Sequence, residues 1–471
     1  MKLFHLSLAT LLTLTLTLIL ALLTTTPTTI TTTTTNHPLL LASLAFSALA
    51  LLLLYRRSRP RPVLLIDYAC YKPDFDRKCS SEACKYFISA SRRFSPESES
   101  FMSDILAKSG VGDEVYAPPL VFQTDNTHAK LHSAFQEAEE GMFSAVDSLL
   151  DKTHIHPSMI DILIVACSVF APSPSLSSLV VNKYKLNPDI KTYNLSGMGC
   201  SAATVSIDLA AKILRSAWKP THALIVATEN ISLNWYFGDN RPMLVANCIF
   251  RVGAAAVLLS NDARRWRSKA KMELSLSLRT HHGADDAAHN SAVQMEDAHG
   301  NIGVSLSKDL VRVAGEGLRV HMRALAPLVL PLSEILRYAC ARAMSALARG
   351  GGRARHVVPD FMAGFEHACV HTGGKAVIAA IGRTMGLDEY VTEPARMALH
   401  RFGNTSSSLV FYQLAYFEVK GRVKAGDRLW MVAFGTGFKA CSLVWIALRD
   451  SAPEADNPWN DCEHRYPVKG C

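Results

Sequence analysis

The sequence predicts an α/β fold in which helices cover central β-sheets, preceded by an apolar N-terminal anchor. Three observations support this. Strand-like apolar runs alternate with helix-like segments from residue 63 to residue 448. One strand-like run, DILIVACSV at 161–169, is apolar almost throughout, as expected of a strand buried on both faces. Two long runs without charge come before the first strand. With 471 residues, the chain suits two or three domains or one large duplicated domain.

The first 62 residues have the composition of a membrane anchor. Residues 3–23 form a Leu- and Thr-rich run of the length that crosses a bilayer. A Thr-rich stretch at 24–35 separates it from a second apolar run at 38–55, which ends in four arginines within 56–61. Positive residues stay on the cytosolic side of a membrane. We therefore expect a two-helix hairpin with a lumenal turn, and everything after Tyr55 in the cytosol.

A cleaved signal peptide is the alternative for this segment, because Lys2 followed by an apolar core resembles one. The first run is long, no clear A-x-A site follows it, and a second apolar run comes next. Asn194, Asn230 and Asn404 also stand in N-x-S/T sequons near the expected active site, where glycans would block it. These features favour the hairpin and a cytosolic catalytic part.

The soluble part divides into two halves at a polar, Arg-rich stretch, 260–271. We place the N-terminal half at 63–265 and the C-terminal half at 266–471. The first is expected to contain strands at 63–68, 161–169, 223–228 and 254–259 and helices at 134–150 and 201–218. The second is expected to contain helices at 310–324 and 407–419, a strand or helix at 377–380, and strands at 428–434 and 442–448. No internal repeat is visible residue by residue.

Charge and cysteine content exclude some classes of function. The formal net charge of +8 comes from scattered Lys and Arg residues, without the clustered basic and aromatic footprint of a nucleic-acid-binding protein. The 11 cysteines lack a disulfide-framework spacing, which indicates reduced thiols in a cytosol-facing protein. Cys70, Cys79 and Cys84 invite a metal interpretation, but no matching CxxC or HxxxH pair follows.

The segment NLSGMGCSAA at 194–203 is the most informative one. Its glycines allow a tight turn, and Cys200 stands where a helix of small residues begins. A thiol at a helix N-terminus feels the positive end of the dipole, which favours thiolate. Taken alone, the pattern fits a catalytic nucleophile and a buried structural cysteine equally well.

Three further Gly-bearing segments carry polar groups. His367 and His371 lie four apart in FEHACVHTGG, a spacing that could bind zinc on a helix, but the Gly-Gly pair indicates a loop and no HExxH arrangement is present. HRFGNTSSS at 400–408 carries Asn404 on a polar loop that opens a helix. GTGFK at 435–439 places Gly435 and Gly437 in a turn after an apolar strand. No G-x-G-x-x-G follows an early strand, so a dinucleotide site is rejected.

A cysteine, a histidine and an asparagine on such loops suit one kind of chemistry. The thiolate of Cys200 can accept an acyl group from a thioester. Imidazole and carboxamide N–H groups can then stabilise the enolate formed when a malonyl thioester loses CO₂. Neither task requires a metal or an organic cofactor. A hydrolase triad fits less well, because no G-x-S-x-G elbow or papain-type cysteine context is present.

The chain closely resembles the plant 3-ketoacyl-CoA synthases, the condensing enzymes of microsomal fatty-acid elongation. The resemblance covers most of the soluble part. It is carried, in one order, by VYAPP, SLSSLVVNKYKLNPDIKTYNLSGMGCSA, NCIFRVGAAAVLLSN, THHGADD, VSLSKDL, PLVLPLSE, HTGGKAVI, LHRFGNTSSS, FGTGFKA and the tail NPWNDCEHRYPV. Two N-terminal spans also fit that family.

The resemblance implies roles for individual residues. Cys200 corresponds to the nucleophile, His371 to the catalytic histidine directly before the Gly-Gly turn, and Asn404 to the asparagine of HRFGN. His281, His367 and His400 correspond to supporting histidines. The implied fold is the thiolase fold, two similar βαβαβαββ halves layered α-β-α-β-α, as a homodimer.

The implied reaction is decarboxylative Claisen condensation of malonyl-CoA with a long-chain acyl-CoA, giving a 3-oxoacyl-CoA. The resemblance also implies a location in the endoplasmic-reticulum membrane and partnership with the elongase reductases and dehydratase. Two alternatives stay open. One is a polyketide-type or other ketoacyl synthase of the same fold, and the other is a non-catalytic scaffold subunit of the elongase. The acyl chain length is not predicted by the sequence.

Overall fold

The structure is a computed structural model, and it describes residues 60–122, 131–347, 358–371 and 373–470, together with residues 45, 47 and 48. The chain divides into two units, Met1–Pro60 and Arg61–Cys471. The expected membrane spans therefore lie outside the described residues. Within the described part, no helix has both the length and the apolar character needed to cross a bilayer. The sheet, its covering helices and the cavities all belong to the unit from Arg61 onwards.

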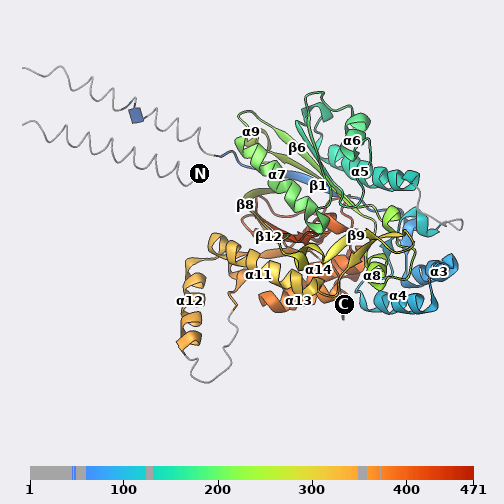
Figure 1. Cartoon of the computed structure of the whole chain (residues 1–471). Coiled ribbons are helices and arrows are strands. Elements are labelled where there is room, and N and C mark those ends of the chain that lie inside the picture. Colours follow the sequence, from blue (N-terminus) through green and yellow to red (C-terminus); the bar gives the residue numbers. More distant parts are fainter. Residues whose placement is uncertain are drawn as a thin grey trace, which may run out of the picture. The chain divides into compact units, whose positions relative to one another are not determined.

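A nine-stranded mixed sheet runs through this unit (Figure 1). The strands follow the order β11-β12-β13-β8-β1-β7-β6-β4-β5. Their bounds are β1 Leu64–Cys70, β4 Ile162–Ala166, β5 Lys191–Leu195, β6 His222–Thr228, β7 Ala254–Ser260, β8 Met272–His281, β11 His367–Val370, β12 Arg428–Gly435 and β13 Lys439–Ala447. Two short ribbons lie apart from it: β2 Lys78–Cys79 with β3 Val115–Tyr116, and β9 Ala292–Glu296 with β10 Ile302–Leu306.

The strand directions repeat between the two parts of the sheet. In the first part β4 runs parallel to β6, β6 is antiparallel to β7, and β7 is antiparallel to β1. In the second part β11 runs parallel to β12, β12 is antiparallel to β13, and β13 is antiparallel to β8. The two parts meet where β1 pairs with β8. This repeat supplies the duplication that the residues themselves did not reveal.

Successive strand residues belong to different hydrophobic cores, because side chains alternate between the faces of a strand. On β4, Leu163 lies in a core with helices α5 (Leu131–Thr153) and α6 (Leu176–Tyr184), whereas Ile164 lies in a central core. On β12, Met431 also points into the central core, whereas Trp430 packs with α11 (Leu310–Val329) and α13 (Lys375–Met385). The central core holds α7 (Ala202–Ser216) and α15 (Leu409–Val419). The expected α-β-α-β-α layers are thus confirmed.

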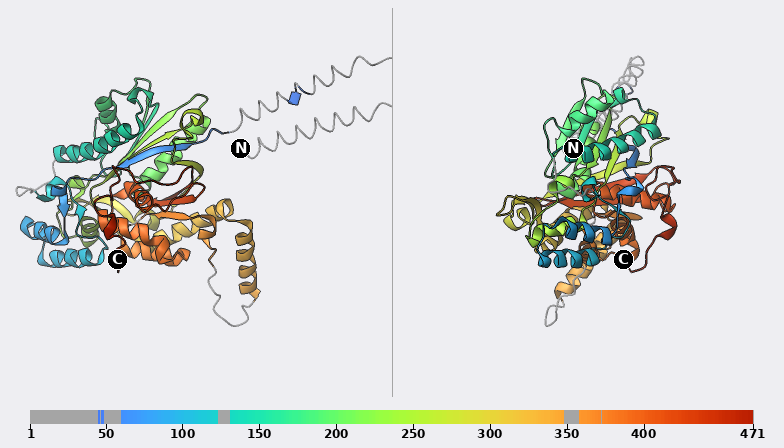
Figure 2. Two further views of the ribbon diagram at one scale, coloured as in Figure 1. Left: turned by 180° about the vertical axis from the view of Figure 1, so that it is seen from behind. Right: turned by 90° about the vertical axis from the view of Figure 1, so that its right-hand side faces the viewer.

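The remaining helices surround these layers (Figures 1 and 2). A separate core holds α3, α4 and α8 together, with Phe87, Met102 and Leu244 among its buried side chains. The bounds of the remaining helices are α3 Ser81–Ser91, α4 Pro96–Lys108, α8 Arg241–Ile249, α9 Ala263–Trp266, α10 Asp286–His289, α12 Leu332–Leu347 and α14 Glu389–Phe402. Helix α12 projects away from the body of the unit in both views.

Most predicted elements match the structure, with informative differences. The ambiguous segment 377–380 lies within helix α13. The predicted helix at 310–324 continues to Val329. His367 lies on a strand, β11, where a loop was expected, because this short segment pairs with β12 inside the sheet. Strand β5 was not predicted as a separate element, since its residues are mostly exposed at the sheet edge and lack an apolar pattern.

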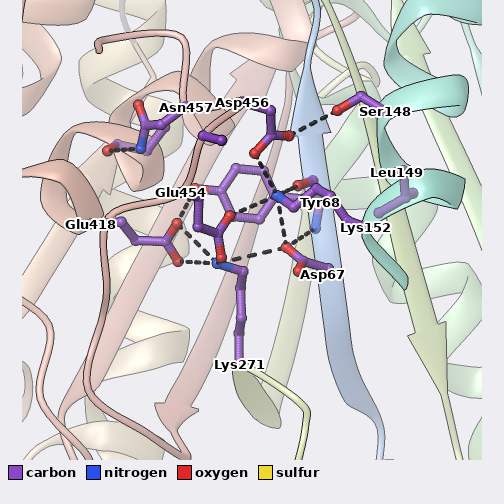
Figure 3. Close-up of polar contacts among 12 residues, drawn as sticks. Asp67, Tyr68, Ser148, Leu149, Lys152, Lys271, Glu418, Glu454, Asp456 and Asn457 are labelled. Carbon is purple, nitrogen blue, oxygen red and sulfur yellow. Dashed lines mark hydrogen bonds and ion pairs between the residues drawn. The ribbon is translucent and has the colours of Figure 1, made fainter. Parts of the chain in front are cut away.

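A buried ionic network fixes the C-terminal tail to the sheet (Figure 3). Lys271 Nζ donates to both carboxylate oxygens of Glu418, at 3.1 and 3.2 Å, and also to Glu454 of the tail. Lys152, from α5, bonds Glu454 at 2.6 Å and lies 3.2 Å from Asp67 on β1. The ammonium groups thereby compensate carboxylates that have little access to water.

Candidate active site

A cavity of about 330 Å³ lies among the loops that carry the Gly-flanked motifs. Its lining is largely apolar. Cys200, His371 and Asn404 all line it, although they are separated by as many as 204 positions (404 − 200) in the sequence. Part of the wall comes from helix α8 and from the β9–β10 ribbon. The fold therefore brings together the three residues to which the resemblance assigns catalysis.

Cys200 lies in a 3-10 turn, Gly199–Ser201, directly before helix α7. The turn requires glycine at position 199, where φ is +57° and a Cβ would lie 2.5 Å from the backbone nitrogen of Thr436. The side chain of Cys200 is partly accessible. Strand β5 leads into this turn, so the sheet and helix α7 together fix the position of the sulfur.

The protonation state of Cys200 differs from the expectation drawn from its position at a helix start. Burial raises the pKa of the Cys200 thiol to about 12, while hydrogen bonds from Ser406 and Asn404 lower it in part. Loss of hydration thus outweighs the helix dipole, which is worth about 0.3–1 kcal/mol near a surface. The raised pKa favours the thiol in the free enzyme, whereas the helix start alone favours the thiolate. Attack on a thioester therefore requires a base.

His371 is placed to be that base. It follows β11 at the carboxyl end of the strand, and its backbone N–H donates to Val432 O at 2.9 Å. The ring is only 1 % exposed and packs edge-on against Phe434, with ring centroids 5.3 Å apart. Burial lowers the pKa of His371 to about 3, so the imidazole is neutral at physiological pH. Its Nδ1 atom has no hydrogen-bond partner among the described residues, which leaves it available to a substrate.

Asn404 is held from both sides by backbone. Its N–H donates to Ile249 O and its carbonyl accepts from Arg251 N, both at 3.0 Å. The side-chain Oδ1 accepts the backbone N–H of Ser406 at 2.9 Å. This bond assigns the oxygen and leaves the NH₂ group to donate, which it does toward Cys200. The arrangement offers an amide donor beside the reacting sulfur.

Gly435 and Gly437 also line the cavity. Gly435 is pressed against the cysteine turn, since a Cβ there would lie 2.3 Å from Met198 O and 2.9 Å from Cys200 N. Only glycine lets the end of β12 approach the turn this closely. The backbone nitrogen of Cys200 therefore lies at this contact, beside the cavity.

Three polar residues of the site were not singled out from the sequence. Glu229 follows β6, and its Oε1 accepts from the backbone N–H groups of Ser168 and Val169 at 2.9 and 3.1 Å. Ser406 donates to Glu229 Oε2 at 2.9 Å and lies 3.7 Å from Cys200 Sγ. His289 also lines the cavity. An acidic residue at the carboxyl end of a buried strand was the signal that could have identified Glu229.

The three supporting histidines lie outside the cavity lining. His281 is exposed at the end of β8, where its Nδ1 accepts from Gly283 N at 3.0 Å. His367 bonds Asp427 at 2.8 Å through Nε2 at the beginning of β11. His400 bonds the Tyr466 hydroxyl at 3.0 Å through Nδ1, which ties helix α14 to the tail. Their contacts are with neighbouring protein groups.

The strand also removes the zinc alternative for His367 and His371. Four residues of extended chain span about 13 Å, so two histidines at this spacing cannot bind the same ion. Within the ranges that the structure describes, no cluster of three or more His, Cys, Asp or Glu side chains is arranged to hold a metal.

Two family models match successive parts of the chain. Residues 55–347 match the family described as FAE1/Type III polyketide synthase-like protein. Residues 363–446 match the 3-Oxoacyl-[acyl-carrier-protein (ACP)] synthase III C terminal family.

Relatives in Arabidopsis thaliana extend over most of the chain. The chain is 47 % identical to 3-ketoacyl-CoA synthase 11 over 420 residues, which are 88 % of this chain and 81 % of that protein. It is 45 % identical to 3-ketoacyl-CoA synthase 17 over 412 residues, 88 % of this chain and 84 % of that protein.

Solved structures share the fold at low sequence identity. The type III polyketide synthase domain of Steely1 from Dictyostelium aligns with a TM-score of 0.64 at 19 % identity, over 82 % of this chain and 99 % of that one. CsyB complexed with CoA-SH aligns with a TM-score of 0.64 at 20 % identity, over 82 % and 100 %. The fold is therefore that of the type III polyketide synthases, a thiolase-like fold.

Proposed function

Because the chain belongs to the 3-ketoacyl-CoA synthases, within the FAE1/type III polyketide synthase-like family, we propose that its cavity joins an acyl-CoA to malonyl-CoA at Cys200. The protein is a condensing acyltransferase of very-long-chain fatty-acid elongation. It forms a 3-oxoacyl-CoA and releases CO₂ and CoA. The observation that carries the assignment of the site is the convergence of Cys200, His371 and Asn404 on one largely apolar cavity.

The first half-reaction transfers the acyl group. The neutral imidazole of His371 takes the proton of the Cys200 thiol as the sulfur attacks the acyl-CoA carbonyl carbon. The backbone N–H of Cys200 donates to the carbonyl oxygen, which becomes negative in the tetrahedral intermediate. The C–S bond to CoA then breaks, and the imidazolium returns its proton to the departing CoA thiolate. An acyl-thioester on Cys200 and free CoA result.

The second half-reaction forms the new carbon–carbon bond. Malonyl-CoA loses CO₂, and the electron pair of the broken bond passes into an enolate whose oxygen accepts from His371 and the Asn404 amide. The α-carbon of the enolate attacks the acyl-thioester carbonyl, and the bond to Cys200 Sγ breaks. The leaving thiolate takes up one proton, which restores the resting thiol. Each step uses groups of this chain alone, so we propose no metal or organic cofactor.

The two alternatives from the sequence are less well supported. Relatives at 44–47 % identity carry the 3-ketoacyl-CoA synthase name, while two solved type III polyketide synthases are only 17 and 19 % identical. A scaffold subunit would have no need of a buried neutral histidine and a cysteine that line the same cavity.

The membrane location is part of the proposal. Two uncharged runs at 3–23 and 38–55, with arginines following, support a hairpin in the endoplasmic-reticulum membrane and a cytosolic catalytic unit. Asn404, one of the sequon asparagines, is 1 % exposed inside the cavity, where a glycan has no room. The 3-oxo product further requires a reductase and a dehydratase, which we propose as elongase partners.

We also propose a homodimer. Strand β5 forms one edge of the nine-stranded sheet, and its outer backbone groups lack a strand neighbour among the described residues. An uncovered sheet edge pairs readily with a second copy. The same strand leads directly to the turn of Cys200, so a dimer contact here would steady the nucleophile.

The assignment of Cys200 is tested with the full-length enzyme in membranes. Radiolabelled acyl-CoA is supplied, and labelled protein and 3-oxoacyl-CoA are measured. Cys200→Ser is expected to abolish both, whereas Cys340→Ser, which changes an exposed cysteine on α12, is expected to retain both. Condensing activity in the Cys200→Ser enzyme would overturn the assignment.

A further inference from the structure

A second cavity, of about 310 Å³, lies between helices α11 and α12 and is separate from the catalytic one. Its wall is largely apolar and includes Leu318, Met322, Leu330 and Phe361. Of the side chains that give the catalytic cavity its chemistry, none lines it. The condensation mechanism therefore gives this cavity no task.

Arginines supply the charge of this second cavity. Arg319 and Arg323 lie four residues apart on α11, and therefore on one face, and Arg342 reaches the same cavity from α12. All three are exposed, and none forms a hydrogen bond or ion pair with any described residue. By contrast, Arg337 on α12 is already paired with Glu334, through two hydrogen bonds of 2.6 and 2.5 Å. Three uncompensated guanidinium groups around an apolar cavity match a ligand with an acidic head and an apolar tail.

The surroundings of the cavity favour a bilayer as the source of that ligand. Five large apolar side chains at the end of α11 and along α12 are at least half exposed: Leu328, Leu332, Leu336, Met344 and Leu347, with exposed fractions of 54, 69, 56, 64 and 86 %. Helix α12 projects from the body, so these side chains are not covered by the rest of the described unit (Figures 1 and 2). Leucine, methionine and arginine together are typical of a surface that lies in a membrane interface.

Residues at the beginning of the unit also support a membrane as the source of the ligand. The apolar runs that precede residue 60 connect to the unit at Arg61, and β1 runs inward from the side on which α12 projects (Figures 1 and 2). Arg61 donates a hydrogen bond to the carbonyl of Trp218, whose side chain is 86 % exposed. Tryptophan and arginine are enriched where protein meets the membrane surface.

We infer that this corner of α11 and α12 is a binding site for an acidic phospholipid of the membrane. The phosphate binds to Arg319, Arg323 and Arg342, an acyl chain occupies the apolar cavity, and the exposed leucines of α12 enter the interface. The inference rests on the proposed membrane anchoring. Each arginine near an anionic surface strengthens binding about fivefold, so the three together provide the preference for acidic lipid.

The test uses the full-length chain in lipid nanodiscs of phosphatidylcholine, with and without phosphatidylserine. Hydrogen–deuterium exchange is followed in peptides from Leu332–Leu347. We expect slower exchange when phosphatidylserine is present. Changing Arg319, Arg323 and Arg342 to Gln should return the rate to that in phosphatidylcholine alone. The matched control changes Lys108, Arg264 and Lys269 to Gln, which removes the same charge from exposed positions elsewhere and should keep the protection.

Several outcomes would overturn the inference. These are equal exchange in the two lipids, equal loss of protection in the control variant, and protection by inorganic phosphate added to phosphatidylcholine nanodiscs. Exchange in phosphatidylcholine alone is compared between wild type and variants, which shows that α12 itself is intact. If the chain did not co-purify with nanodiscs, the proposed membrane anchoring would be contradicted. If the wild-type chain in nanodiscs showed no condensing activity, the proposed function would be contradicted. Both are distinguishable from a failure of the lipid site.

Discussion

The hydroxyl oxygen of Ser406 lies 3.7 Å from Cys200 Sγ and donates a hydrogen bond of 2.9 Å to Glu229. Ser406 has a φ of +56°, a conformation that few residues other than glycine adopt. One hydroxyl proton cannot serve both partners at once. Both acceptors lie within reach of that proton, and a thiolate at Cys200 would compete for it more strongly than the thiol does. Ser406 therefore couples the state of the nucleophile to Glu229.

Ser406→Ala should slow condensation. The change removes a donor that stabilises the developing thiolate, a loss of roughly 1 kcal/mol or about fivefold in rate. The measurement is malonyl-CoA-dependent formation of 3-oxoacyl-CoA at saturating substrate. Ser408→Ala is the control, because Ser408 is equally buried but bonds only Thr405. Equal effects of the two changes would show that Ser406 acts through packing alone.

Alkylation of Cys200 should reveal its resting protonation state. With a pKa raised to about 12 by burial, the thiolate fraction grows about tenfold per pH unit below that value. The rate of reaction with iodoacetamide should therefore rise continuously from neutral pH to about pH 10, since only the thiolate reacts. The pKa of His371 is lowered to about 3, so its ring is neutral over this range and imposes no step.

Labelling of Cys200 is isolated by mass spectrometry of its peptide, with Cys200→Ser as the blank. A rate that levels off near neutral pH would indicate a preformed thiolate–imidazolium pair. That result would contradict the role of His371 as a base acting during acyl transfer.

Gly435→Ala should inactivate the enzyme. A Cβ there would lie 2.3 Å from Met198 O and 2.9 Å from Cys200 N, and backbone atoms cannot give way as a flexible side chain can. We expect acyl-enzyme formation from labelled acyl-CoA to fall by at least tenfold, since misplacing a nucleophile costs about that much or more. Gly315→Ala on α11 is the matched control. Its Cβ meets no atom within 4 Å, and alanine favours a helix, so activity should be retained.

The sequence could predict the layered fold and the loops of the three candidate residues for physical reasons, whereas the roles of these residues came from the family resemblance. Apolar runs buried on both faces mark strands such as β4 and β6, because no polar alternation interrupts them. Cys200, His371 and Asn404 each lie beside glycines that shape a loop, which makes them visible along the chain.

Other parts of the site depend on packing that no local pattern reports. Ser406 is one of three adjacent serines, and only the fold shows which of them approaches Cys200. The raised pKa of Cys200 could not be predicted from the sequence, since the helix start is local whereas the burial of the thiol comes from distant segments. The exposed edge strand β5 was missed for the same reason, because its partner β4 lies 25 residues earlier (191 − 166).

The buried network around Lys271 provides a test of stability. Lys271→Met leaves the carboxylates of Glu418 and Asp67 with less compensation, at a cost of about 3–5 kcal/mol in the free energy of unfolding. Thermal unfolding of the full-length chain in detergent measures the effect. Lys219→Met is the control, because its 3.3 Å ion pair with Asp161 is largely exposed and should contribute less than about 1 kcal/mol.

The loss of unfolding free energy caused by Lys271→Met should become smaller as the pH falls. Burial raises the pKa of Glu418 and of Asp67 above their ordinary values, and removing Lys271 should raise both further. Such a carboxyl group has a higher pKa in the folded state than in the unfolded state, where it is about 4. It therefore stabilises the native state at pH values below the unfolded pKa, and this contribution is lost as the pH rises through the folded pKa. The destabilisation should therefore be largest at neutral pH and shrink on acidification. The double change Lys271→Met with Glu418→Gln should recover much of the lost unfolding free energy at neutral pH, because the glutamine carries no charge. A loss of stability that stays constant with pH and persists in the double variant would show that Lys271 stabilises the fold through its packing instead.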